Sequence, residues 1–180
     1  MKPSTLFSLL KIGDISLSNR ICMSALTRMR ADPITGVPND LHVKYYSQRA
    51  CAGLILTECT HINPTATSFP GSTGIYSQEQ VEGWKKVTKA VHDKGGKIIM
   101  QIWHGGRSCH PDNGNGSQPI SSFANRIRDQ TFTKNGKVDH VVPRQMNEGD
   151  IEEITTDFKK GAENAKEAGF DGLELHGANG

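Results

Sequence analysis

The sequence predicts an α/β fold: a (β/α)8 TIM barrel truncated to about its first four β/α units, with a capping hairpin at the N-terminus. Four apolar segments alternate with three helix-like segments, an order that favours parallel strands joined by right-handed crossovers. Each apolar segment ends in polar residues, as barrel strands do at the catalytic face. No Gly-x-Gly-x-x-Gly follows the first strand, which disfavours a dinucleotide-binding sheet. A complete barrel needs ~250 residues, whereas this chain has 180.

The expected strands are short aliphatic runs bounded by turn signals. Gly13-Asp14, between apolar residues of segment 4–19, predicts the N-terminal hairpin. In the last strand, Leu173 and Leu175 alternate with smaller or polar residues before a glycine-rich turn. The predicted strands of the barrel cover residues 20–26, 54–58 and 97–102, and the segment from Phe170 up to His176.

Helices are predicted where apolar residues recur at helical spacing after a capping residue. The predicted ranges are about Asn39–Ala52, Gln78–Lys94 and Glu148–Ala168. The connection over residues 104–147 is too long for a plain loop. Thr131–Thr133 and Val138–Val142, around Asn135-Gly136, predict a hairpin within it. We expect this insertion to lie over the active face.

Composition and charge exclude several classes of protein. The chain has 21 basic and 19 acidic residues and no basic run interleaved with aromatics, so neither nucleic acid nor a membrane is an expected partner. No segment is long and apolar enough for a signal peptide or a bilayer span. The 4 cysteines lack Cys-x-x-Cys spacing, which is typical of reduced thiols in a cytoplasmic protein.

The candidates for chemistry are polar side chains that follow the four strands. His176 and Asn179 are neutral hydrogen-bonding groups suited to polarising a bound carbonyl or anion. Each candidate also has a structural interpretation, for example Gln101 as a barrel-interior residue and Thr27 as the end of its strand. Because parallel strands end at one edge, we expect the following residues to converge: Thr27 and Arg28; Glu58, Cys59 and Thr60; Gln101, Trp103, His104 and Arg107; His176 and Asn179.

Other polar residues are expected to be structural. Glu58 and Glu174 are interpreted as buried carboxylates paired with a base such as Arg20 or Lys97. Nothing in the sequence indicates an activated thiol at Cys59. No metal site is predicted, because the spacing of the loop histidines matches no ligand pattern. No lysine ends a strand, which argues against a Schiff-base aldolase.

Four segments carry a resemblance to a known family. From about Thr5 to the last residue, the chain resembles the Old Yellow Enzyme family of FMN-dependent ene-reductases. Any one of the four segments is a weak signal, but their joint order and spacing are specific. The segments are Asn19-Arg-Ile-Cys-Met-Ser-Ala-Leu-Thr-Arg28, Gly53-Leu-Ile-Leu-Thr-Glu-Cys-Thr60, Gln101-Ile-Trp-His-Gly-Gly-Arg107 and His176-Gly-Ala-Asn-Gly180.

The resemblance implies cofactor contacts for five residues. Thr27 is similar to the threonine whose hydroxyl binds the flavin carbonyl near N5. Ala25 and Leu26 would lie along the flavin through their backbone. Cys59 occupies a position where the family usually has Gly or Ala, beside the ring. Gln101 is similar to the glutamine that binds the pyrimidine edge.

The resemblance also implies the reaction. NAD(P)H would reduce FMN, and hydride would then pass to the β-carbon of an α,β-unsaturated carbonyl substrate. His176 and Asn179 are similar to the pair that holds the substrate's carbonyl oxygen, where negative charge develops. Preorganised donors at such an oxygen lower the barrier.

The chain departs from the family in ways that open an alternative. Ser24-Ala25 replaces the usual Ala-Pro. The family's proton-donating tyrosine, its flavin-binding arginine and its phosphate-binding turns would all follow Gly180. We therefore interpret residues 1–180 as the N-terminal half of an FMN-binding barrel domain. The alternative is an inactive half-barrel that acts, if at all, by association with another chain, as a homo-oligomer or with a complementary half-barrel.

Overall fold

The computed structural model describes residues 5–178 and contains a parallel sheet covered by helices. The strands of the sheet are β3 (Cys22–Met23), β4 (Leu54–His61), β5 (Ile98–Trp103) and β10 (Gly172–Leu175). The helices are α1 (Asp40–Ser47), α2 (Gln78–His92) and α3 (Glu148–Glu167). These elements confirm the predicted strands and helices of the barrel.

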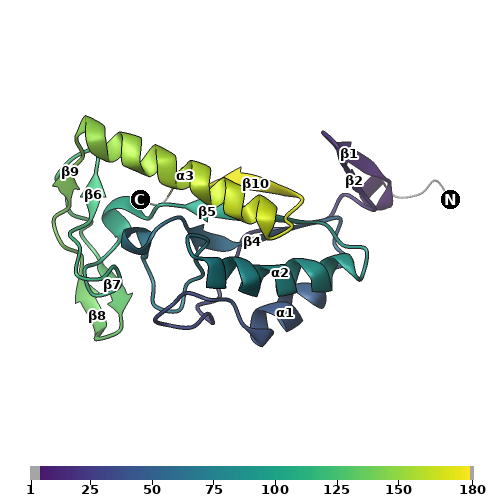
Figure 1. Cartoon of the computed structure of the whole chain (residues 1–180), viewed down its shortest axis with the longest axis horizontal. Coiled ribbons are helices and arrows are strands. Elements are labelled where there is room, and N and C mark those ends of the chain that lie inside the picture. The colour runs from purple at the N-terminus through teal and green to yellow at the C-terminus, as the bar shows by residue number, and fades with distance from the viewer. Residues whose placement is uncertain (1–4, 179–180) are drawn as a thin grey trace.

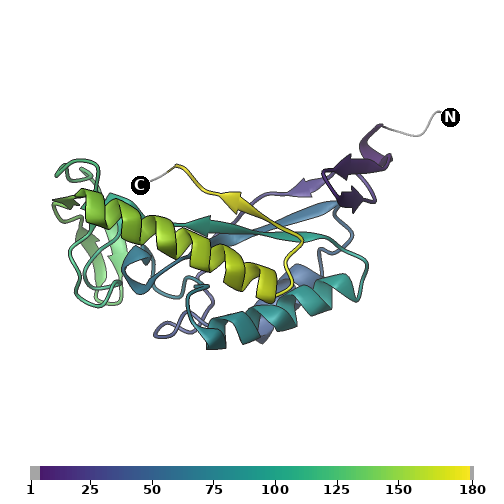
Figure 2. The same cartoon turned by 45° about the horizontal axis from the view of Figure 1, so that its top comes forward.

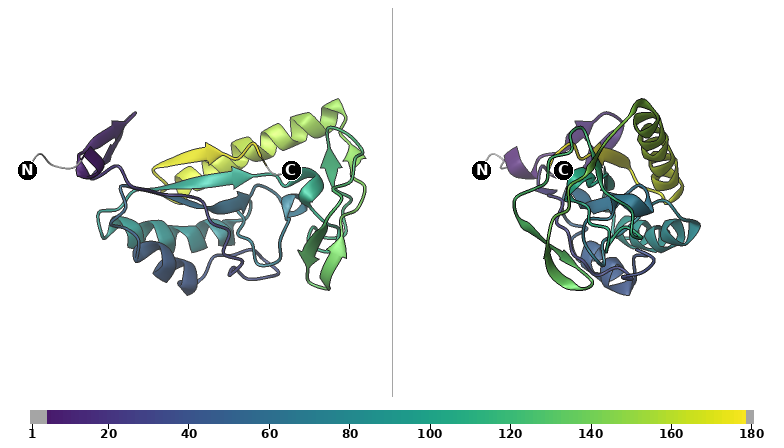
Figure 3. Two further views of the ribbon diagram at one scale, coloured as in Figure 1. Left: turned by 180° about the vertical axis from the view of Figure 1, so that it is seen from behind. Right: turned by 90° about the vertical axis from the view of Figure 1, so that its left-hand side faces the viewer.

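The sheet and its helices have the arrangement of about half of a (β/α) barrel. The strand order is β10-β5-β4-β3, and every neighbouring pair is parallel. The three helices lie on one face of the sheet (Figures 1 and 2), and in the described part of the chain no helix covers the opposite face (Figure 3). Because all strands run the same way, their carboxyl ends meet at one end of the molecule.

The helices begin at strong caps and pack on the sheet through one apolar stripe. Asn39, Ser77 and Asn147 each form a capping box at the start of a helix. Trp84 of α2 is fully buried in the core with Met100 of β5. None of the described helices is long and apolar enough to cross a membrane.

The N-terminal hairpin lies where the barrel strands begin (Figure 1). It follows a 3-10 turn, η1 (Thr5–Phe7), and pairs β1 (Leu10–Ile12) with β2 (Ile15–Leu17). Gly13 supplies the left-handed conformation that the turn needs, with φ 57°. A Cβ on Gly172 would lie 3.6 Å from Ile15 Cδ1, so the hairpin reaches the first residue of β10. The predicted capping hairpin is confirmed.

The connection between β5 and α3 forms small sheets at the opposite end of the molecule (Figure 1). β7 and β8 form the predicted antiparallel hairpin around Asn135-Gly136. The elements of this connection are η3 (Gly106–Ser108), β6 (Ile120–Ser121), β7 (Gln130–Thr133), β8 (Gly136–Asp139) and β9 (Arg144–Gln145), and a further 3-10 turn, η2 (Pro64–Ala66), follows β4.

Some predicted boundaries are wrong. The first strand was expected over 20–26 but only Cys22–Met23 pairs with β4, because the following segment contacts β4 through side chains instead of a backbone ladder. β4 extends three residues past Glu58, to His61. The first helix ends at Ser47 rather than Ala52, and turns lead from it to Gly53.

Candidate functional site

Two of the candidate residues, Cys59 and Gln101, form a first row with Glu174 across the sheet near the carboxyl ends of its strands. Cys59 pairs with Gln101, and Gln101 pairs with Glu174. Ile98 and Met100 pack among the helices, so alternation places this row on the opposite, barrel-interior face. Gln101 Nε2 donates a 2.6 Å hydrogen bond to Glu174 Oε1. The Gln101 amide is therefore held in one orientation by its neighbour.

A β-bulge in β4 shapes this row. The register shifts between Leu56 and Cys59, so Thr57 and Glu58 together oppose one residue of β5. Bulges re-aim side chains and occur often beside active sites. Here Cys59 stays in the interior row, while the Glu58 carboxylate turns to the α1 side of the sheet.

The segment after β3 runs beside the end of β4 and carries the predicted flavin residues of the first strand. Thr27 Oγ1 lies 3.2 Å from Cys59 Sγ. The backbone N–H of Arg28 donates a 3.0 Å hydrogen bond to Glu58 Oε2. Two consecutive residues of the segment are thus tied to two consecutive residues of β4. The segment also contains the half-buried Ala25 and the exposed Leu26.

The Cys59 thiol is neutral at pH 7. Burial raises its pKa above the ordinary 9.0, and the contact with Thr27 opposes this only in part. Only the thiolate is a strong nucleophile, so the environment of Cys59 does not activate it. Its sulfur contributes bulk and a weak hydrogen bond at the position beside Thr27.

A second row lies one step nearer the strand ends. His61 pairs with Trp103, and the His176 backbone N–H donates to Ile102 O at 3.1 Å. Ring centroids are 5.8 Å apart for His61 and Trp103, and 5.4 Å apart for Trp103 and His176. The structure therefore brings His176 to the same end of the sheet as the first row. Asn179 lies outside the described residues.

His61 is a residue of this end that the sequence reasoning missed. Residues 59–77 were expected to be loop, yet β4 continues through His61, which is 1% exposed. Burial, with a smaller effect of His104, lowers the pKa of His61 to about 3. The imidazole is neutral at physiological pH. The signal for it was the spacing of Cys59 and His61, two residues apart as on one face of a strand.

Glu58 is buried as predicted, but its basic partner is not the predicted one. Its side chain is 0% exposed, and Oε1 lies 3.3 Å from His42 Nε2. That contact is close without being a well-aligned hydrogen bond. Tyr46 adds a 3.4 Å hydrogen bond to the same oxygen, and its hydroxyl accepts the backbone N–H of Glu58 at 2.9 Å.

Neither predicted base pairs with a glutamate of the sheet. Arg20 Nε donates to Ser8 Oγ at 3.0 Å, and Lys97 Nζ donates to Asp171 Oδ1 at 2.8 Å. Both bases lie near the amino ends of the strands, one or two residues from where a strand begins, and so cannot reach groups at the carboxyl ends.

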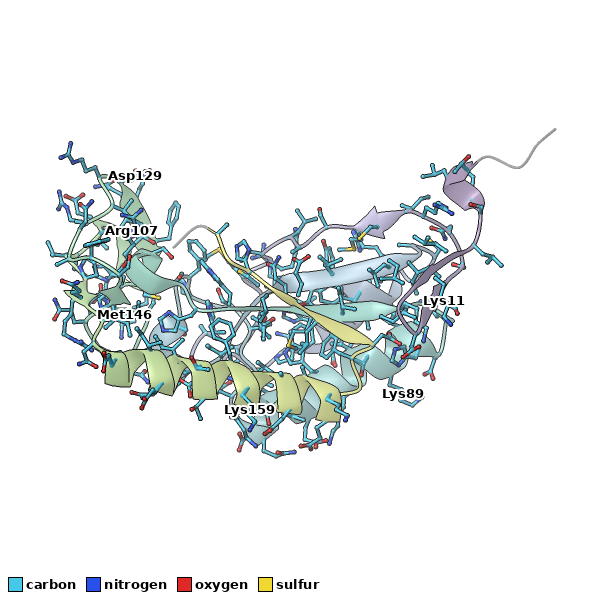
Figure 4. The ribbon with its side chains drawn as sticks, turned by 90° about the horizontal axis from the view of Figure 1, so that it is seen from above. Lys11, Lys89, Arg107, Asp129, Met146 and Lys159 are labelled. Atoms are coloured by element: carbon cyan, nitrogen blue, oxygen red, sulfur yellow. The ribbon has the colours of Figure 1, made fainter. Side chains whose placement is uncertain are left out.

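Other strand-end residues diverge from the two rows. The Arg28 guanidinium lies 4.7 Å from the centroid of the Tyr45 ring, on α1. Arg107 lies with Asp129 and Met146 at the end of the molecule opposite Lys11 (Figure 4). Within residues 5–178 no three His, Cys, Asp or Glu side chains could hold a metal ion together.

The first row, together with Thr27 that lies against it, carries donors that fit the edge of a flavin ring. The Thr27 hydroxyl and Gln101 amide are neutral and offer both donors and acceptors, as the carbonyl and N–H groups of an isoalloxazine require. Cys59 is 6% exposed and adds no charge. These residues would hold the ring edge, and the carboxylate of Glu174 would fix the amide that binds it.

The parallel β/α half-barrel places this chain in the class of α/β-barrel proteins, whose sites lie at the carboxyl ends of the strands. The chain matches the family described as NADH:flavin oxidoreductase / NADH oxidase over residues 5–180, and it belongs to that family. Among curated relatives, 12-oxophytodienoate reductase 1 of Oryza sativa subsp. japonica is 44% identical over 94% of this chain and 44% of its own length. The probable flavin mononucleotide-dependent alkene reductase of Leishmania infantum is 45% identical over 95% of this chain and 48% of its own.

The fold agrees with this membership. The old yellow enzyme homologue of Zymomonas mobilis superposes with a TM-score of 0.95 at 40% identity. The superposition covers 98% of this chain and 49% of that protein. The chain therefore spans about half the length of the relatives it matches. The resemblance to the Old Yellow Enzyme family and the truncated barrel fold are both confirmed.

Proposed function

We propose that residues 1–180 are the N-terminal half of an FMN-dependent oxidoreductase of the Old Yellow Enzyme type. The reaction is the NAD(P)H-driven reduction of the C=C bond of α,β-unsaturated carbonyl compounds. The observation that carries the proposal is that Thr27 lies against Cys59, and Cys59 pairs with Gln101, near the carboxyl ends of the strands. The names of the two curated relatives support the class of substrate.

The first row and the segment after β3 bind and orient the cofactor. Thr27 donates its hydroxyl to the flavin carbonyl, Gln101 binds the pyrimidine edge, and Ala25 and Leu26 contribute backbone contacts. Cys59 packs beside the ring as a neutral thiol. FMN, when bound, would supply the redox chemistry between NAD(P)H and the C=C bond of the substrate. The insertion over 104–147 lies at the strand ends (Figure 1), and we expect it to cover this face.

His176 and Asn179 hold the substrate's carbonyl oxygen. Charge develops on that oxygen as hydride arrives, and loss of one preorganised donor costs about 3 kcal/mol. The ring of His176 packs on Trp103, which limits the orientations that it adopts. His176→Ala in a cofactor-loaded protein is expected to lower kcat/KM for a cyclic enone about 10²–10³-fold.

A specific observation favours association with a second half-barrel. Leu173 and Leu175 lie on the helix-covered side of the sheet, in register with Met100 and Ile102, yet they are 40% and 71% exposed. β10 and β3 are also open edges, and such edges pair readily with other chains. The chain alone is then expected to bind FMN weakly, and a complementary half restores binding.

Flavin titration tests the proposal. FMN fluorescence and absorbance are followed as the chain is added, alone and together with the C-terminal half of the Zymomonas mobilis relative. Gln101→Leu removes the amide that binds the ring, and Gln78→Leu, on the exposed start of α2, is the matched control. Weaker FMN binding by Gln101→Leu, but not by Gln78→Leu, supports the proposal. Equal FMN binding by the two variants contradicts it.

A further inference from the structure

A buried polar cluster on the α1 side of the sheet is not part of the proposed flavin contacts. It contains Glu58 of β4, with His42 and Tyr46 of α1, and all three side chains are almost fully buried. A buried carboxylate is costly unless its oxygens are satisfied. The contacts of this carboxylate therefore indicate what it holds in place.

The two oxygens of Glu58 have different partners. Oε1 faces α1, 3.3 Å from His42 Nε2 and 3.4 Å from the Tyr46 hydroxyl. Oε2 accepts the backbone N–H of Arg28 at 3.0 Å. His42 Nδ1 accepts the Asn39 backbone N–H at 3.2 Å and lies 3.3 Å from Asn39 Oδ1, so the ring is held at the start of α1 with Nε2 beside Glu58. The carboxylate thus joins α1 to the segment that follows β3.

This segment needs an anchor, because it has no strand ladder. Arg28 is the next residue after Thr27, whose hydroxyl lies against Cys59, the neighbour of Glu58. The Arg28 side chain is held on α1 as well, over the Tyr45 ring. The bulge in β4 is what allows Glu58 and Cys59 to serve both ties at once.

From this geometry we propose that Glu58 is a positioning residue for Thr27. Its carboxylate fixes the Thr27–Arg28 peptide, and so sets where the Thr27 hydroxyl meets the flavin carbonyl. The effect of Glu58 on the flavin contact rests on the proposed function. The anchoring of the segment by Glu58 does not depend on that function. The two parts are therefore tested separately.

Glu58→Gln is the informative variant. An amide has one acceptor oxygen, and its NH₂ group would face the Tyr46 hydroxyl, which donates to Glu58 Oε1, if the oxygen stayed on Arg28. One tie is therefore lost in either orientation. Thr88→Val is the matched control, because Thr88 is 3% exposed and its hydroxyl bonds Ala168 O at 2.6 Å, far from the segment.

The first readout is hydrogen exchange of the Arg28 amide in the chain without flavin. Glu58→Gln is expected to accelerate it on the order of tenfold relative to core amides of β5, because the Arg28 N–H then has a neutral amide oxygen, or no acceptor, in place of a charged carboxylate. Thr88→Val should leave that ratio unchanged. If Glu58→Gln does not fold, Tyr46→Phe loosens the same carboxylate and should give a smaller selective acceleration. Unchanged Arg28 exchange, or equal acceleration of all amides, overturns the proposal.

The second readout is the midpoint potential of FMN bound to the chain completed by the Zymomonas mobilis C-terminal half. Glu58→Gln and Thr27→Val should both lower the midpoint potential, since each weakens a donor to the reduced flavin. Thr88→Val should leave the midpoint potential unchanged. A potential that falls with Thr27→Val but not with Glu58→Gln overturns the positioning role. If no FMN binds, the proposed function fails, and hydrogen exchange still decides the anchoring.

Discussion

Asp171 offers the sharpest test of how the fourth strand is attached. Its Oδ1 accepts from Lys97 Nζ at 2.8 Å, and its Oδ2 lies 2.8 Å from His92 Nε2 and accepts the Ile98 backbone N–H at 2.9 Å. Its own N–H donates to Ile98 O at 2.9 Å. One 12% exposed carboxylate therefore joins β10, β5 and the end of α2.

The cost of Asp171→Asn follows from these contacts. The backbone hydrogen bond to a charged acceptor contributes roughly 1.5 kcal/mol. The Lys97 and His92 side chains are 38% and 35% exposed, so their pairs contribute only about 0.5 kcal/mol each. The amide side chain of the variant keeps one acceptor oxygen, so we expect Asp171→Asn to lower the free energy of unfolding by about 2 kcal/mol. With an m-value of about 2 kcal/mol/M, the urea midpoint falls by about 1 M.

The pH dependence has a definite sign. Burial raises the pKa of Asp171, but the bonds from Lys97, Ile98 and His92 outweigh burial and hold the pKa below its ordinary 3.8. A depressed carboxylate pKa stabilises the fold above the unfolded pKa, and the stability is lost as pH falls through the folded value. The difference in the free energy of unfolding between wild type and Asp171→Asn should be constant from pH 7 to about 5. It should shrink below about pH 4.

Urea denaturation followed by far-UV circular dichroism measures this difference. Asp93→Asn is the control, because Asp93 is 59% exposed and pairs with Lys89 on the helix surface. Loss of this exposed pair should lower the free energy of unfolding by less than about 0.5 kcal/mol. Equal midpoints for the two variants at pH 7 would refute the reasoning about Asp171.

Two further predictions concern backbone fit and thiol chemistry. A Cβ at Gly53 would overlap the backbone carbonyl of Asn19, so Gly53→Ala is expected to destabilise by about 3 kcal/mol or more in the same denaturation assay; a wild-type midpoint would show that the chain relaxes there. Burial raises the pKa of Cys59 above 9.0 and of Cys109 to about 11. At pH 8 a disulfide reagent should therefore modify the exposed Cys51 much faster than either, and fast labelling of all three would contradict their burial.

Sequence patterns predicted the elements of this fold because each element has a local cause. The cap at Asn39, the helical spacing of apolar residues in Gln78–Lys94, and the alternation in Gly172–Leu175 are readable without tertiary contacts. The short first strand was not predictable in this way. Residues after Met23 look like a continuing strand, but their ties to β4 run through the side chains of Cys59 and Glu58.

The candidate site was predictable in its members but not in its connections. Topology alone brought Gln101 and His176 to one end of the sheet. The partner of Glu58 was wrong because a bulge turns its side chain to α1, and a one-residue shift in register reverses which face a side chain takes. His61 was missed because the length of β4 depends on its pairing with β5, which the local sequence does not specify.

The measurement that tests the central claim most directly is FMN binding by the chain completed with the Zymomonas mobilis C-terminal half, with and without Gln101→Leu. We predict that the completed protein binds FMN, that Gln101→Leu weakens binding at least about tenfold, and that the chain alone binds weakly. Equal FMN binding by the Gln101→Leu protein would contradict the site at the strand ends. A stable yellow monomer of the chain alone, with one FMN per chain, would contradict the need for a second half.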